Sequence, residues 1–135
     1  MFIFRVSPLI FEELRMKTKE TELKEAREIY FKAKVYYQYV RAEADKLDGP
    51  YCELYDNGKL TDEEIVKKFT EHDKKFKVSE AHDILRMAED KVLEAGKRIF
   101  KTLYPEEFNE AKEVFDSGLI TVRRKVLDLI LSLRV

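Results

Sequence analysis

The stretch from Glu22 to Leu47 decides the fold and reads ELKEAREIYFKAKVYYQYVRAEADKL. Apolar side chains recur in it at alternating spacings of three and four residues, which places them along one side of an α-helix. This first stripe consists of Leu23, Ala26, Tyr30, Ala33, Tyr37, Val40, Ala44 and Leu47. We expect one long helix here that ends at Gly49 and Pro50, because glycine suits the position after a helix and proline cannot extend it.

A second apolar stripe lies on roughly the opposite side of the same predicted helix. It consists of Phe31, Val35, Tyr39 and Ala42. A helix that is apolar on two sides must be covered on both, so it is either central in its own bundle or shared with another chain. Tyrosine combines apolar area with a polar hydroxyl and therefore suits an interface. We expect this stripe to bind a second copy of the chain or another protein.

Capping patterns predict the helices that follow. Thr61 and Glu64 match a capping box, and the helix that they begin runs to about Phe76. Ser79 begins another helix, in which alanines and Gly96 give a narrow side that allows close approach of a neighbouring helix. The apolar stripe of that helix consists of Ala81, Leu85, Ala88, Val92, Ala95 and Ile99.

Breaks in the remaining sequence predict two further helices. Tyr104-Pro105 ends one helix and opens the next, Gly118 ends that one, and Thr121 caps the last. At the other end, Ser7 caps a helix that starts at Pro8, after a short strand or apolar cap over residues 1–6. This helix either ends near Lys17 or continues into the next segment through Thr18 or Thr21. The pattern predicts an all-α fold, a bundle of four to six helices with one long central helix, in a single domain over residues 1–135.

Composition excludes several classes of protein. Hydrophobic residues make up 44% and charged residues 39% of the chain, and no apolar run approaches the length of a membrane span. We therefore expect no membrane partner and a cytoplasmic location. The dense Lys and Glu content is thermophile-like. The single cysteine, Cys52, excludes an intramolecular disulfide, and we interpret it as a small apolar residue in a connecting segment.

Two His-Asp pairs, His72-Asp73 and His82-Asp83, resemble the metal-binding pairs of helical phosphohydrolases of the HD type. That resemblance implies His72, His82, Asp83 and Asp90 as metal ligands and a metal-dependent phosphohydrolase activity. The alternative interpretation is two partly exposed histidines, because aspartate at Asp83 falls in the first turn of a predicted helix, where the helix dipole favours it. We adopt the alternative and predict no metal site and no catalytic residue.

A basic run in the last predicted helix raises a second alternative. Arg123, Arg124 and Lys125 follow an acidic helix after a glycine turn, an arrangement loosely like a helix-turn-helix that binds nucleic acid. Against it, 26 basic and 27 acidic side chains give a formal net charge of −1, so no overall field attracts a polyanion.

Sequence motifs for cofactor binding are absent. The chain has no phosphate-binding glycine loop, no dinucleotide fingerprint and no zinc-protease motif, so we expect no cofactor. The sequence therefore favours a non-catalytic interaction protein, which acts as a homo-oligomer or on a protein partner.

Overall fold

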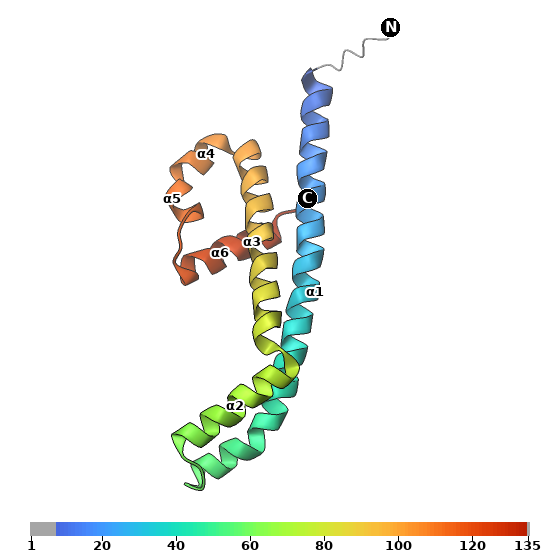
Figure 1. Cartoon of the computed structure of the whole chain (residues 1–135). Coiled ribbons are helices and arrows are strands. Elements are labelled where there is room, and N and C mark those ends of the chain that lie inside the picture. Colours follow the sequence, from blue (N-terminus) through green and yellow to red (C-terminus); the bar gives the residue numbers. More distant parts are fainter. Residues whose placement is uncertain (1–7, 135) are drawn as a thin grey trace. The chain divides into compact units, whose positions relative to one another are not determined.

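The computed structural model describes the backbone of residues 8–134 and the side chains of residues 18–134, so the predictions for residues 1–6 and for Ser7 lie outside it. This part of the chain contains six helices and no strand, which confirms the all-α prediction (Figure 1). The helices are α1 (Pro8–Asp56), α2 (Asp62–Phe76), α3 (Val78–Leu103), α4 (Pro105–Glu110), α5 (Lys112–Phe115) and α6 (Ile120–Ser132).

The described residues group into two compact units. Unit 1 contains residues 8–29 and 89–134, and unit 2 contains residues 30–88. Helices α1 and α3 each contribute one part to each unit.

Unit 2 consists of the second part of α1, all of α2 and the first part of α3. Its core contains Val40 and Ala44 from α1 and Val78 and Ala81 from α3, with Tyr37 and Phe76 packed against them. Tyr37 also contacts His82 with ring centroids 5.7 Å apart. The predicted first stripe therefore faces the core, as its spacing indicates.

In unit 1, α6 packs against α3 (Figure 1). The largest fully buried side chains are Leu23 of α1, Val92 and Ile99 of α3, and Ile130 of α6. Full burial of a side chain of this size contributes about 1.5–3 kcal/mol. The prediction that Gly96 permits close helix packing is confirmed, because Gly96 lies against the Ile130 side chain.

Two polar pairs set the register of α1 against α3 in unit 1. The Lys19 ammonium donates to the Thr102 hydroxyl at 2.7 Å, and Arg98 pairs with Glu22 at 2.9 Å. From the first pair to the second, the residue number rises in α1 and falls in α3, so the two helices are antiparallel here. Exposed pairs of this kind contribute little to stability, so the buried side chains provide most of it.

Helix α1 continues through Gly49 and Pro50, so the predicted helix end at these residues is wrong. The clash that keeps a residue before proline out of the helical region involves its Cβ atom, which Gly49 lacks. Contacts with α2 then hold the last turns: the Tyr51 and His72 rings lie 5.4 Å apart between centroids. Cys52 consequently lies in a helix and not, as predicted, in a connecting segment.

The end of α1 is a left-handed glycine turn eight residues beyond Pro50. Gly58 has φ +71°, its N–H donates to the Tyr55 carbonyl at 2.9 Å, and the Lys59 N–H donates to the Leu54 carbonyl at 2.8 Å. This hydrogen-bond pair is the Schellman motif.

The start of α2 confirms the predicted capping box. The Glu64 N–H donates to the Thr61 hydroxyl at 3.2 Å, and the Thr61 N–H donates to the Glu64 carboxylate at 3.3 Å. The single residue Lys77, with φ 54°, separates α2 from α3. Helix α3 therefore begins at Val78, one residue before the predicted start.

Two predictions for the C-terminal region are wrong in detail. The helix expected after Pro105 is divided at Ala111 into the short helices α4 and α5. Thr121 does not cap the last helix, because α6 begins at Ile120. Its N-cap residue is Leu119, whose side chain has no hydrogen-bond acceptor. The Ser117 hydroxyl accepts from the Leu119 N–H at 3.2 Å instead.

Candidate functional site

The predicted interaction stripe lies on the exposed side of α1 in unit 2. Phe31, Val35 and Tyr39 are 51%, 65% and 62% exposed, and Ala42 is exposed as well. The core-facing stripe of the same helix is almost entirely buried. The two sides of α1 are therefore both apolar, but within unit 2 only one of them is covered.

This exposure bears on the prediction that α1 is a central helix. If α1 were central in its own bundle, other parts of the chain would cover Val35 and Tyr39. Both side chains stay more than half exposed, so the prediction of a long central helix is not confirmed for this stripe. Hydrophobic burial is the main favourable term in protein association, so an apolar stripe left in water favours contact with another molecule.

The side chains of the stripe are mainly apolar. Its members are two aromatic, one branched aliphatic and one methyl side chain. Phe31 packs beside Tyr30 with ring centroids 5.4 Å apart, and the Lys34 ammonium lies 5.9 Å from the Tyr30 ring centroid. These contacts hold the aromatic edge of the stripe in place.

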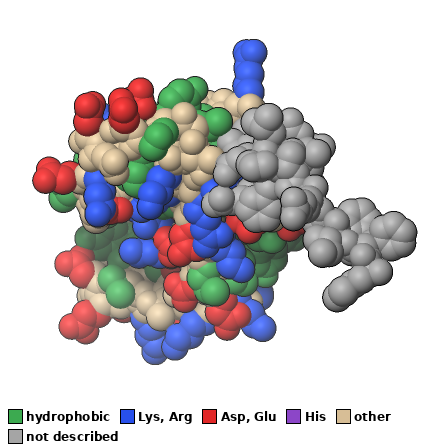
Figure 2. Space-filling model, turned by 90° about the horizontal axis from the view of Figure 1, so that it is seen from above, with side chains coloured by type: hydrophobic (Ala, Val, Ile, Leu, Met, Phe, Trp, Pro, Cys, Tyr) green, Lys and Arg blue, Asp and Glu red, His purple; other side chains and the backbone are tan. Residues whose placement is uncertain are grey.

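The basic run predicted as a nucleic-acid site is partly neutralised. Arg123 forms an ion pair with Asp90 of α3, both in unit 1, whereas Arg124 and Lys125 are exposed. Figure 2 shows one face of the chain, on which Lys and Arg side chains are interspersed with Asp and Glu. Nucleic-acid binding depends on a concentrated positive field, and the ion pair with Asp90 neutralises one of the three cations of this run.

The two histidines have different neighbours. His72 is largely buried in unit 2, and its Nδ1 atom is 2.7 Å from the Asp48 carboxylate. His82 is exposed and packs its ring edge on Tyr37, and Asp83 is also exposed. In the described part of the chain, no three His, Cys, Asp or Glu side chains are grouped so that they could hold a metal ion.

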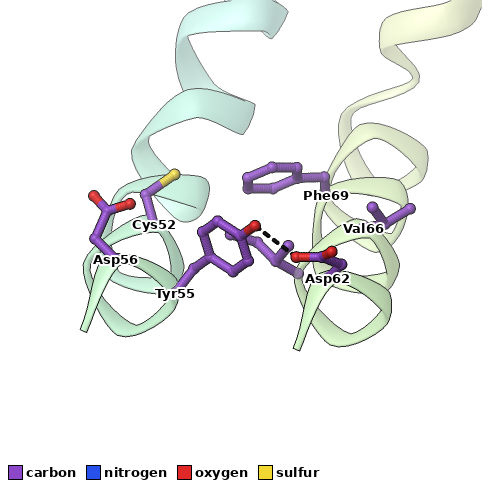
Figure 3. A pocket seen from close by; sticks show the side chains of 7 residues that line it. Cys52, Tyr55, Asp56, Asp62, Val66 and Phe69 are labelled. Carbon is purple, nitrogen blue, oxygen red and sulfur yellow. Dashed lines mark hydrogen bonds between the residues drawn. The ribbon is translucent and has the colours of Figure 1, made fainter. Parts of the chain in front are cut away.

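A pocket that the sequence did not indicate lies between α1 and α2 in unit 2 (Figure 3). Its volume is about 340 Å³. Cys52, Tyr55 and Asp56 of α1 line one side, and Asp62, Ile65, Val66 and Phe69 of α2 line the other. Sequence reasoning missed it because it placed a helix end at Pro50, which removed the α1 side of the pocket from the helix.

One short hydrogen bond closes the end of this pocket nearest the turn. The Tyr55 hydroxyl donates to the Asp62 carboxylate at 2.5 Å (Figure 3). This bond, together with the charge of Asp62, raises the pKa of Tyr55 above its ordinary value, because both favour the protonated phenol. Tyr55 therefore remains a hydrogen-bond donor throughout the neutral range.

Comparisons with known proteins provide no guide to this surface or pocket. No family model matches the chain, and neither a curated protein nor a solved structure is significantly similar to it. Among the described residues, no helix combines the length and the apolar character that a membrane span needs. We therefore infer the function from the geometry of this chain.

Proposed function

We propose that this protein is a non-catalytic helical interaction protein that self-associates through Phe31, Val35, Tyr39 and Ala42. A single observation supports the proposal: these side chains form a continuous apolar stripe on a helix and stay exposed in the single chain. Scattered exposed apolar residues are normal on protein surfaces, whereas a contiguous stripe at helical spacing is typical of an interaction site.

A second copy of the chain is the occupant that we favour. Phe31 and Tyr39 each lie four residues from Val35, so two stripes in antiparallel orientation place Val35 at the centre and an aromatic ring opposite an aromatic ring on either side. A twofold interface needs this kind of self-complementary surface. The formal net charge of −1 also means that two copies do not repel each other at long range.

The size of the stripe sets the strength that we expect. Three large side chains at these exposures offer on the order of 300 Å² per chain, against roughly 800 Å² per partner in a stable complex. Association through the stripe alone is therefore weak, with a Kd in roughly the micromolar range or above. Neighbouring exposed side chains such as Tyr36 enlarge the interface if they take part.

The mass of the protein in solution tests the proposal. Light scattering across a range of concentrations should show mass rising from monomer toward dimer for the natural chain. The variant Val35→Glu/Tyr39→Glu should remain a monomer, because its charges disrupt the apolar stripe. Its melting temperature should not change, because both substituted residues are exposed in the single chain. Ile120→Glu is the matched control, since Ile120 is 76% exposed but lies in unit 1.

Two results would contradict the proposal. The first is a natural chain that stays monomeric at the highest concentration, because the protein then does not self-associate. If the double variant dimerises as readily as the natural chain, a different surface carries the contact.

A further inference from the structure

The pocket between α1 and α2 has the apolar interior of a small-molecule site. The buried residue Ile65 lines it, and Val66, Phe69 and Cys52 supply further apolar surface. Its volume of about 340 Å³ lies within the range of ligand pockets, roughly 300–1,000 Å³. The interior suits an aliphatic or aromatic body rather than a fully polar ligand.

Two carboxylates and no Lys or Arg side chain line the pocket. Asp56 lies on the α1 side and Asp62 on the α2 side (Figure 3). No Lys or Arg in the described chain forms an ion pair with either rim carboxylate.

Asp56 lies where the helix itself opposes its charge. It is the last residue of α1, and the last turn of that helix contains no basic residue. The partial negative charge at a helix C-terminus disfavours a carboxylate there, so Asp56 raises the energy of the free protein. A cation bound beside Asp56 would relieve this repulsion.

The polar groups of the pocket also lack donors. Tyr55 uses its hydroxyl proton on Asp62, which leaves the phenol oxygen, the second Asp62 oxygen and the Asp56 carboxylate as acceptors. A complementary head group must therefore donate hydrogen bonds and carry positive charge. An ammonium group does both, with three donors and one charge.

We propose that this pocket binds a small amphipathic organic cation, namely a primary alkylammonium ion. Its hydrocarbon chain lies against Ile65, Val66 and Phe69, and its ammonium group lies at the α1 side of the rim beside Asp56. This site is separate from the interaction stripe, so its failure and the failure of the proposed self-association are independent results.

Cys52 provides a direct readout of occupancy. It is the only cysteine of the chain and lines the pocket, so the rate at which a thiol reagent modifies it falls when a ligand covers it. The probes are hexylammonium, hexanol and hexanoate, which share the chain length and differ in head-group charge. We expect hexylammonium to slow the modification at concentrations about tenfold lower than hexanol, and hexanoate to have the weakest effect.

Two conservative variants locate the charge recognition. Asp56→Asn should weaken hexylammonium protection by roughly five- to tenfold and leave hexanol protection unchanged. Glu53→Gln is the matched control, because Glu53 lies near the same helix end but does not line the pocket, and it should change neither. Amide chemical shifts of Ile65, Val66 and Phe69 in the natural chain provide a second measure of binding that needs no variant.

Each contrary result overturns the proposal. Equal protection by hexylammonium and hexanol would show an apolar pocket without cation recognition. Protection by none of the three probes, together with unchanged amide shifts, would show that the pocket binds no ligand of this class. An Asp56→Asn variant that binds hexylammonium as well as the natural chain would show that the rim charge plays no part.

Discussion

Gly96 of α3 lies so close to Ile130 of α6 that a Cβ atom added to Gly96 would overlap the Ile130 side chain. Glycine in the middle of a helix normally costs about 0.5–1 kcal/mol relative to alanine. Here the missing side chain is what allows α6 to pack against α3, and Ile130 is almost completely buried as a result.

We therefore predict that Gly96→Ala destabilises the protein by about 1–3 kcal/mol, in spite of the higher helix propensity of alanine. Chemical denaturation monitored by circular dichroism measures the effect. Gly118→Ala is the control, because Gly118 has open space around it and no positive φ, and it should be close to neutral. Equal stability of Gly96→Ala and the natural chain would mean that α6 does not pack as described.

Pro50 provides a test of the continuous α1 helix. Proline inside a helix removes one backbone N–H and clashes with the preceding turn. Because α1 continues through Pro50, replacement by alanine removes the cost of a proline inside a helix. It also makes the unfolded chain more flexible, which offsets part of this gain, so the net increase in stability should be about 1–2 kcal/mol. A loss of stability in thermal denaturation would instead indicate that Pro50 ends the helix.

Arg27 holds the C-terminus of α6 in unit 1. Its guanidinium donates to the carbonyls of Ile130 and Leu133 at 2.7 and 2.6 Å, and burial lowers its pKa without removing its charge at neutral pH. Both bonds come from one guanidinium nitrogen, Nη2, and lysine is one atom shorter, so Arg27→Lys lengthens or breaks these bonds and should cost about 1–3 kcal/mol. Arg98→Lys, in an exposed pair with Glu22, is the matched control and should cost less than about 0.5 kcal/mol. Similar losses for the two variants in urea denaturation would contradict this role of Arg27.

The pair of Asp48 and His72 links α1 to α2 in unit 2. Their side chains are only 11% and 12% exposed, so removal of one partner leaves the other buried without a hydrogen bond. We predict that His72→Ala and Asp48→Ala each cost about 1–3 kcal/mol and that the double variant costs clearly less than their sum. A double-mutant cycle measures this coupling. Additive losses would show that the two residues do not interact.

The periodicity of the sequence was sufficient to predict most of the helices and the core. The buried first stripe of α1, the capping box of Thr61 and Glu64, and the close approach at Gly96 all follow from local patterns. The end of α1 did not, because α2 packs against its last turns and outweighs the usual effect of Gly49-Pro50. Tertiary contacts of this kind are absent from any local pattern.

The candidate sites divide in the same way. The interaction stripe was visible as a spacing of four, four and three residues, and the structure places it in solvent. The pocket was not visible, because its α1 side and its α2 side come together only through the turn that follows a helix of unexpected length. Lys77 as a left-handed residue was equally hidden, since glycine or asparagine is the usual signal.

A dilution series followed by NMR of labelled methyl groups tests self-association through the stripe most directly. We predict that the Val35 and Ala42 methyl signals shift progressively with protein concentration, while those of Ile120 and Leu119, which are exposed in unit 1, stay fixed. Val35 and Ala42 signals that do not change from the lowest to the highest concentration would contradict it.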